Sequence, residues 1–277
     1  MKTLSKAQEV ERSIMKKYKK TIWSKFILAL KTYKLVNDGD KIAVCISGGK
    51  DSMLLAILMK MLKKYSETNF EVYFLSMDPG YNKENRLRLE ENAKMLDVPV
   101  QIFDTKIFDT VVDMGGSPCY MCARMRRGHL YNEAKKLGCN KIALGHHFSD
   151  VIETTVMGML YGAQLQGMLP KLRSQNFEGM ELIRPLYCIN EDDIIAWRDA
   201  NDLKFLNCAC SFTEMCAVDG TESSSARRET KMLIKSLRSK IPEVEHHIFK
   251  SLHNVNVDTF PGYKKDGQYH DFNDWYE

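Results

Sequence analysis

The sequence predicts an α/β fold in which helices cover both faces of a parallel, five-stranded sheet. Short apolar runs of strand length alternate with segments of helical composition through residues 41–201, and this alternation is typical of parallel strands joined by helical crossovers. The first of these strands passes through two adjacent glycines directly into a helix. At 277 residues, 44% of them hydrophobic, the chain is long enough for one such core with smaller additions.

The elements follow one another in a simple order. Residues 6–35 predict one or two basic amphipathic helices, because apolar side chains recur at helical spacing with lysines between them. A polar, glycine-containing turn at residues 37–40 ends this segment. The elements predicted for the core are strand 41–47, helix 51–65, strand 71–77, helix 82–96, strand 98–103, a helix that begins near residue 123, strand 141–146, helix 150–160, strand 183–189 and helix 191–201.

Beyond residue 203 the pattern contains no strand. Apolar positions predict helices over residues 223–238 and 243–254, whereas the polar and aromatic segment 261–277 has no period and is predicted to be extended or mobile. We therefore expect three parts, a basic helical segment 1–36, an α/β domain 37–203 and a helical C-terminal extension 204–277.

Positive charge is concentrated at the N-terminus. Residues 1–35 hold ten Lys or Arg against two Glu, a net charge of +8, while the whole chain carries +4, so the remainder carries −4. A basic arm of this kind indicates a polyanionic partner bound in a salt-dependent way, and a solvated helix face explains it equally well.

Whether the cysteines form disulfides or bind metals depends on the cellular compartment of the protein. The sequence has no run long enough to span a bilayer and no signal-peptide pattern, so we expect a cytoplasmic protein with no membrane partner. In a reducing compartment, closely spaced cysteines indicate metal or redox groups rather than disulfides. Cys119 and Cys122 open a helix beside several arginines, where positive charge favours the thiolate, and Cys208 and Cys210 follow much later.

The spacing of these four thiols does not by itself decide which metal they bind. Two pairs normally suggest zinc, but the Cys-x-Cys spacing is tight for a zinc-ribbon pair. Three thiolates on an iron–sulfur cubane would instead leave one iron free for a ligand that the protein does not supply. Of the other four cysteines, Cys45, Cys139 and Cys188 lie in apolar contexts and are expected to be packing residues, and Cys216 is expected to be a bystander.

The run Ser-Gly-Gly-Lys-Asp-Ser carries the strongest functional signal. Backbone N–H groups in the turn and the dipole of the following helix can bind a phosphate, to which the lysine adds a full charge, and the glycines permit positive φ and close approach of a ligand. The spacing is neither that of a Walker A loop nor that of the dinucleotide fingerprint. The run resembles the pyrophosphate loop of the ATP pyrophosphatase superfamily. The residues expected to bind ATP here are Ser47, Gly48, Gly49, Lys50, Asp51 and Ser52.

Two further positions fall at the same edge of the predicted sheet. In open α/β sheets ligands bind at the carboxyl ends of the strands, so Met77 and its neighbours are candidates for holding the nucleoside part of ATP. Asp150 follows the fourth core strand at a turn into a helix. There its carboxylate can bind Mg²⁺ or handle a proton, and a helix cap is an equally good explanation.

Three more segments extend the resemblance. They are the Cys-x-x-Cys and Arg-Arg-Gly run at 119–131, the Gly-His-His segment at 143–150 and Ile-Arg-Pro-Leu at 183–186. Together with the loop and in this order, over about residues 36–215, they resemble the family of tRNA 2-thiocytidine biosynthesis proteins, whose PP-loop domain has the adenine nucleotide alpha-hydrolase-like fold. The family usually has two consecutive acids after Gly-His-His, where this chain has Ser149 and Asp150.

The resemblance implies an ATP-dependent tRNA sulfurtransferase. In that family a cytidine carbonyl, at position 32 of the anticodon loop, is adenylated and its oxygen is replaced by sulfur. The implied cofactors and partners are ATP, Mg²⁺, a 4Fe-4S cluster, tRNA, hydrosulfide or sulfur derived from a cysteine desulfurase, and a second copy of the chain. The implied cluster ligands are Cys119, Cys122 and Cys210, with Cys208 as the alternative third ligand.

The resemblance also suggests roles for single residues. Lys50, Arg126 and Asp150 are expected to be catalytic, although Arg126 stays protonated, so it can steer the base or a phosphate but cannot act as a base. Gly145 and His146 are expected to face ATP.

Other functions remain compatible with the residues. The same fold supports uridine thiolation, or amide or lysine ligation on an adenylated base with zinc in the cysteine site. Uridine-thiolating relatives usually carry additional terminal cysteines that this chain lacks. A zinc-stabilised RNA-binding module with a vestigial loop, and a persulfide on Cys119 or Cys210 without a cluster, are further alternatives.

Overall fold

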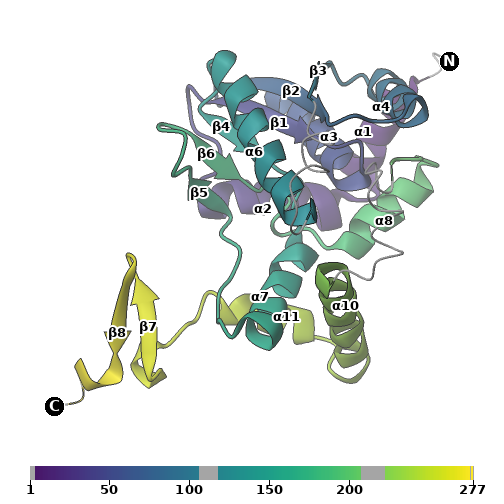
Figure 1. Ribbon diagram of the computed structural model, residues 1–277. Helices are drawn as coiled ribbons and strands as arrows, with labels where there is room; N and C mark the ends of the chain where they lie inside the picture. The colour runs from purple at the N-terminus through teal and green to yellow at the C-terminus, as the bar shows by residue number, and fades with distance from the viewer. Residues whose placement is uncertain (1–3, 106–117, 207–221, 275, 277) are drawn as a thin grey trace. The chain divides into compact units, whose positions relative to one another are not determined.

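The computed structural model describes residues 4–105, 118–206, 222–274 and 276, with side chains except at 118–124 and 222–225. These residues form a six-stranded sheet in the order β3-β2-β1-β4-β6-β5 and a separate two-stranded sheet, β7-β8 (Figure 1). The strands of the large sheet are β1 Lys41–Ile46, β2 Glu71–Asp78, β3 Val100–Asp104, β4 Lys141–Ala143, β5 Lys171–Arg173 and β6 Glu181–Ile183. All of its neighbouring pairs are parallel except β5 and β6.

Helices connect the parallel strands, as the alternating pattern predicts. The longer helices are α1 Lys6–Lys16, the π-helix η1 Lys19–Trp23, α2 Ser24–Tyr33, α3 Lys50–Tyr65, α4 Lys83–Met95, α6 Pro118–Lys136, α7 Phe148–Gly162, α8 Glu191–Ala200, α10 Glu222–Lys240 and α11 Val244–Ser251. Two short 3-10 turns, η2 Val257–Thr259 and η3 Phe272–Asp274, lie near the C-terminus. The α/β class, the five parallel strands and the predicted helices are therefore confirmed, with ends shifted by a few residues.

The strand ends on one side of the sheet were predicted incorrectly. The fourth predicted strand ends at Ala143 rather than at residue 146, and the fifth lies at 181–183 rather than at 183–189. The chain turns after Arg184, where the N–H of Tyr187 donates to the carbonyl of Arg184 at 3.2 Å and Pro185 has no N–H with which to extend the strand pairing. The antiparallel edge strand β5 was missed, since three residues are too short to show a period.

The C-terminal segment is more regular than predicted. Strands β7 Gly262–Lys265 and β8 Gln268–Asp271 form an antiparallel hairpin. Asp266 and Gly267 make its two-residue turn with positive φ values of 52° and 79°, as a type I′ Asp-Gly turn requires. The turn signal was present in the sequence, but the flanking residues lack the apolar alternation that identifies strands.

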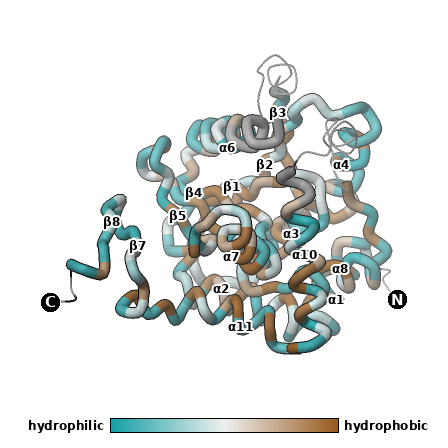
Figure 2. The backbone as a smooth tube through the Cα atoms, turned by 60° about the horizontal axis from the view of Figure 1, so that its bottom comes forward, coloured by the Kyte–Doolittle hydropathy of each residue, from teal (hydrophilic) through white to brown (hydrophobic). Residues whose placement is uncertain are grey.

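Two apolar cores lie on opposite faces of the large sheet. In β1, Ile42, Val44 and Ile46 contribute to one core and Ala43 and Cys45 to the other, as the alternation of side chains along a strand requires. The hydrophobic course of β1 inside the molecule is visible in Figure 2. Helices α1, α2, α3 and α8 contribute to the first core and α6 to the second.

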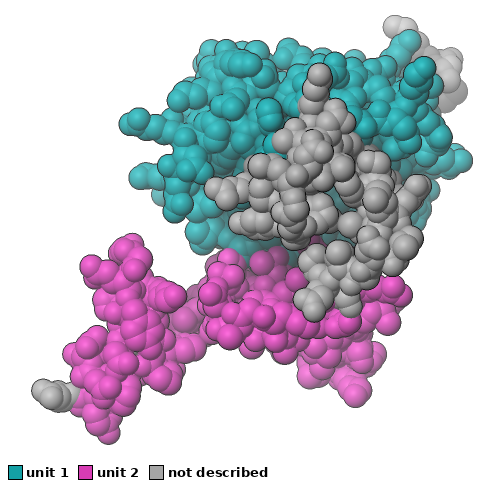
Figure 3. Space-filling model, in the orientation of Figure 1, with its two compact units in different colours: residues 1–151, 168–225 teal, residues 152–167, 226–277 magenta. Residues whose placement is uncertain are grey.

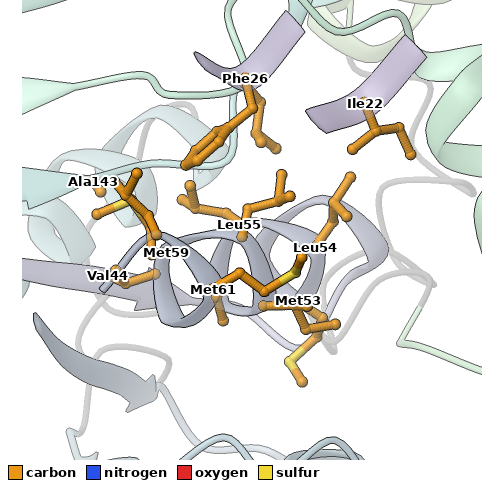
Figure 4. Close-up of a cluster of buried hydrophobic side chains, with 14 of the residues drawn as sticks. Ile22, Phe26, Val44, Met53, Leu54, Leu55, Met59, Met61 and Ala143 are labelled. Carbon is orange, nitrogen blue, oxygen red and sulfur yellow. The ribbon is translucent and has the colours of Figure 1, made fainter. Parts of the chain in front are cut away.

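The basic N-terminal helices are part of the first core. Ile22 and Phe26, both fully buried, pack with Leu54 and Leu55 of α3 (Figure 4). The lysines between the apolar positions face solvent, as an amphipathic pattern predicts. This packing holds α3, and with it the loop at its N-terminus, against the sheet.

The chain divides into two compact units, shown in separate colours in Figure 3. Unit 1 comprises residues 1–151 and 168–225 and contains the large sheet, whereas unit 2 comprises residues 152–167 and 226–277. Within unit 2, Arg227 Nε lies 3.2 Å from Glu153 Oε2. The predicted division at residues 36 and 203 stays a prediction. None of the described helices combines the length and apolarity needed to cross a bilayer.

Candidate functional site

Hydrogen bonds of Ser47 and Ser52 fix the shape of the turn between β1 and α3. The hydroxyl of Ser52 accepts a hydrogen bond from the N–H of Ser47 at 3.1 Å and donates to the carbonyl of Gly49 at 2.9 Å. Gly49 occupies the N-cap position of α3, where no side chain caps the helix. The first-turn N–H groups and the helix dipole therefore remain available to bind an anion.

Gly48 is the position at which this turn tolerates no side chain. Its φ is +81°, and an added Cβ would lie only 2.6 Å from Leu206 Cδ1. The N–H of Leu206 in turn donates to the carbonyl of Gly48 at 3.0 Å. The loop is thus packed against the chain at residue 206, immediately before the segment 207–221.

A cavity of about 380 Å³ opens at the carboxyl edge of the sheet beside this loop. The ends of β1 and β2, the start of α3, α6, the segment after β4 and the start of α7 all contribute to its wall. The residues proposed from the sequence that line it are Ser47, Asp51, Ser52, Met77, Arg126, Gly145, His146 and Asp150. The structure therefore brings together residues that come from four separate segments of the sequence.

Lys50 is not among the residues that line this cavity, although it contacts one of them. Its Nζ is 3.1 Å from Asp51 Oδ2 and 3.0 Å from Glu191 Oε1. Burial lowers the pKa of Lys50, but the two carboxylates outweigh burial and raise the pKa above its usual value. The lysine lines a second cavity, of about 620 Å³, together with Arg88 and Glu191. Glu191 was not identified from the sequence, where its only signal is an acidic first residue of a helix.

Gly145 allows the segment after β4 to touch the loop. A Cβ at this position would lie 3.1 Å from both Asp51 C and Ser52 N. These are backbone atoms that cannot move aside as the tip of a side chain would. A glycine is therefore needed here for close approach.

Asp150 caps the start of α7. Its Oδ2 accepts a hydrogen bond from the N–H of His147 at 3.0 Å, and its own N–H donates to His147 Nδ1 at 3.3 Å. This reciprocal pair has the form of a capping box. Asp150 also lines the cavity, so the structural role and a role in binding or proton transfer are compatible.

Asp51 lines the same cavity and has one carboxylate oxygen without a hydrogen bond. Its Oδ1 is buried without a hydrogen bond, and His147 Nε2 lies 3.7 Å away. Two carboxylates on one cavity, those of Asp51 and Asp150, suit a hard divalent cation. Within the described residues no three His, Cys, Asp or Glu side chains are grouped for a metal. A Mg²⁺ ion held here would therefore complete its shell with phosphate and water oxygens.

Arg126 and Arg127 supply positive charge from α6. Both line the 380 Å³ cavity, and neither makes a hydrogen bond or an ion pair with another described residue. Guanidinium groups in this state are ready to bind an anion or to stack on a base.

The cysteines fall into two groups. Cys45 and Cys139 are buried, and burial raises the pKa of the Cys45 thiol to about 12 and that of Cys139 to about 11. Both are therefore unreactive packing residues. Cys119 and Cys122 lie in the first turn of α6, where side chains are not described, and Cys210 lies outside the described residues together with Cys208.

The sequence as a whole matches a known family. Residues 10–210 match the PP-loop domain. The chain is 34% identical over 262 residues to the tRNA-cytidine(32) 2-sulfurtransferase of Aliivibrio fischeri (strain MJ11). This match covers 92% of this chain and 80% of the relative. The chain is a PP-loop protein of the tRNA-cytidine(32) 2-sulfurtransferase family. A second sulfurtransferase of this name, from Neisseria meningitidis serogroup C, is 33% identical over 250 residues, covering 88% and 73% of the two chains.

A solved structure supports the same fold. The U34-tRNA thiolase NcsA from Methanococcus maripaludis, with its [4Fe-4S] cluster, gives a TM-score of 0.65 over 87% of this chain and 80% of that chain, at 19% identity. This likeness confirms the PP-loop architecture. In a member of the sulfurtransferase family, the uncapped turn before α3 is the PP-loop itself, and the cavity beside it is the candidate active site.

The PP-loop gives a direct test of the geometry around Gly48. We expect Gly48→Ala to lower the free energy of unfolding by about 1–3 kcal/mol, because alanine is strained at positive φ, and to weaken ATP binding at least roughly tenfold, because Leu206 and the loop must move apart. Urea denaturation and calorimetric titration with a non-hydrolysable ATP analogue measure the two effects.

A matched control separates strain from site geometry. Gly39 has a φ of +78°, and nothing lies within 4 Å of a Cβ added there. Gly39→Ala should therefore cost stability alone and leave affinity for the analogue unchanged. Wild-type affinity in Gly48→Ala would contradict the importance of the close contact.

Proposed function

We propose that this chain adenylates a cytidine carbonyl of tRNA, at position 32, with ATP and replaces the oxygen by sulfur. The observation that carries this proposal is the cavity into which the PP-loop, two carboxylates and Arg126 converge. A phosphate-binding turn, a cation site and a cationic wall are the groups that adenylation requires.

The chemistry begins with a poor leaving group. The carbonyl oxygen of the base attacks the α-phosphorus of ATP, the bond from that phosphorus to the bridging oxygen breaks, and pyrophosphate leaves. A sulfur nucleophile then attacks the activated carbon, the carbon–oxygen bond breaks, and AMP leaves with the former base oxygen. Both steps move negative charge onto phosphate oxygens, which fixed donors and cations stabilise.

The residues of the cavity divide this work. The amides of the loop 47–52 hold the phosphates, and Met77 contacts the nucleoside. Asp51 and Asp150 would bind Mg²⁺, which screens charge on the phosphates. Arg126 steers the base or a phosphate through its positive charge.

The remaining predicted residues, Lys50, Gly145 and His146, would contact the bound ATP or add charge near it. Lys50 adds positive charge beside the loop while its two carboxylate partners keep it protonated. Gly145 and His146 complete the wall that faces ATP.

Cys119, Cys122 and Cys210 would hold a 4Fe-4S cluster, since three thiolates are suitable ligands for it. When bound, such a cluster would supply an open iron site for a sulfide. Two observations support the fit. Cys122 precedes Arg126 by four residues of α6, about 6 Å along the helix axis. Cys210 is the fourth residue after Leu206, so covalent geometry keeps their Cα atoms within about 14 Å of each other.

Several partners complete the proposal. The sulfur donor is hydrosulfide or sulfur derived from a cysteine desulfurase, the protein acts in the cytoplasm, and two copies form a homodimer. The resemblance described from the sequence implies these assignments, which the purified protein can test by its sulfur requirement and its mass in solution.

Nucleoside analysis tests the function. tRNA from cells that lack the gene should lose 2-thiocytidine and keep its thiouridines, and the purified protein with ATP, Mg²⁺ and sulfide should restore 2-thiocytidine and release AMP. Loss of a thiouridine instead would assign the chain to uridine. Absence of AMP formation with tRNA present would favour an RNA-binding module, and zinc without labile sulfide in anaerobically purified protein would favour ligation chemistry.

A further inference from the structure

Arg184, which follows β6 directly, is a buried guanidinium that the proposed chemistry does not use. Its side chain is nine-tenths buried. One terminal nitrogen donates to the carbonyl of Leu169, and its Nε is buried without any hydrogen-bond partner. A buried charge with unsatisfied donors is costly unless a ligand completes its hydrogen bonds.

The sheet register places Arg184 beside the candidate active site. Ala143 of β4 pairs with Ile183 of β6, so Leu144 and Arg184 come next at the same level of the sheet. Leu144 lines the 380 Å³ cavity, as does Arg127. Burial and the nearby charge of Arg127 lower the pKa of Arg184 to about 10, against smaller opposing effects of Tyr187, Tyr131 and Asp150. Arg184 therefore lies next to the part of the cavity wall that Leu144 forms, within electrostatic range of Arg127.

We propose that Arg184 and Arg127 bind a backbone phosphate of the tRNA next to the nucleotide being modified. This inference rests on the proposed sulfurtransferase function. A phosphate oxygen would satisfy the unpaired Nε, and the planar fork of a guanidinium matches phosphate geometry. An anion between the two arginines would also remove their mutual repulsion.

The strand order favours RNA over ATP as the source of this phosphate. Along the carboxyl edge the order is β2, β1, β4, β6, with Met77 at the end of β2 and the PP-loop after β1. Adjacent strands are about 4.8 Å apart, so Arg184 lies roughly 10 Å beyond the PP-loop, on the side away from Met77. A nucleotide held between Met77 and the PP-loop leaves the β6 side to the second substrate.

Neutral variants of the two arginines test this assignment. We expect Arg184→Gln and Arg127→Gln each to weaken binding of an unmodified tRNA transcript to the full-length holoenzyme roughly five- to tenfold. The slope of log affinity against log salt should flatten by about 0.7 to 1, the effect of one lost phosphate contact. Affinity for a non-hydrolysable ATP analogue should stay within about twofold, because the analogue sits at the PP-loop. Fluorescence anisotropy over a salt series and calorimetry provide the measurements.

The controls separate binding from folding. Arg173 is exposed, and it pairs with Glu181 at the opposite end of β6, so Arg173→Gln should keep the wild-type affinity and slope. Arg127 is exposed, so its variant remains informative if the thermal midpoint shows that Arg184→Gln does not fold.

Two outcomes would overturn the assignment. The first is wild-type tRNA affinity and salt slope in Arg127→Gln. The second is a variant that loses affinity for the ATP analogue instead of for tRNA. Failure of the wild-type enzyme itself to bind tRNA would instead reject the proposed function.

Discussion

Cys210→Ala is expected to abolish tRNA thiolation, with a loss of at least about 100-fold. Removing one of three thiolates would leave one iron of the iron–sulfur cluster without its protein ligand. Cys119→Ala and Cys122→Ala should behave alike. In each variant, iron and labile sulfide per chain should fall together with activity after anaerobic purification, and both are measured on the same sample as the rate of 2-thiocytidine formation.

The neighbouring cysteine is the matched control. Cys208→Ala removes a thiol two residues away from Cys210 and should keep cluster and activity within about threefold, since it removes no ligand. The opposite result, with Cys208 required and Cys210 dispensable, would exchange their assignments. Full iron and sulfide in an inactive Cys119→Ala or Cys210→Ala protein would support a persulfide carrier instead.

Asp150→Asn is expected to lower the thiolation rate by about 100-fold while changing the free energy of unfolding by less than about 0.5 kcal/mol. The amide oxygen of asparagine can still accept the hydrogen bond that the N–H of His147 donates at 3.0 Å, so the start of α7 stays capped. What the variant loses is the negative charge available to Mg²⁺. A rate assay across a Mg²⁺ titration, combined with urea denaturation, measures both effects.

Asp150→Ala should lose both the cap of α7 and the negative charge available to Mg²⁺. It removes the cap, at a cost of about 1 kcal/mol, as well as the carboxylate. If Asp150→Asn keeps wild-type activity at every Mg²⁺ concentration while Asp150→Ala is merely less stable, the residue is a helix cap and nothing more.

The contrast between Asp51 and Lys50 shows how far a motif can be interpreted by itself. Both belong to one six-residue run, and both were expected to serve ATP. Asp51 lines both the 380 Å³ cavity and the 620 Å³ cavity, whereas Lys50 lines only the 620 Å³ cavity of these two. Consecutive residues of a helix point in different directions, so the motif predicts the phosphate-binding backbone better than it predicts the reach of each side chain.

Glu191 and Arg184 illustrate the signals that sequence reasoning lacks. Glu191 pairs with Lys50 across 141 residues of chain, and a single acid at the start of a helix indicates only a favourable interaction with the helix dipole. Arg184 was part of a recognised segment, but its buried, unpaired Nε depends on the loop that carries Leu169. Long-range burial of this kind leaves no periodic trace.

The sequence by itself determined the alternation of strands and helices, the PP-loop and the family, because these depend on local composition, on residue order and on glycines that only a tight turn requires. The tertiary structure alone decided which side chains share a cavity. Strand order and register bring the ends of β1, β2, β4 and β6 to one edge, and residues more than a hundred positions apart meet there. Such meetings follow from the packing of the sheet and its helices, a property of the whole chain rather than of any segment.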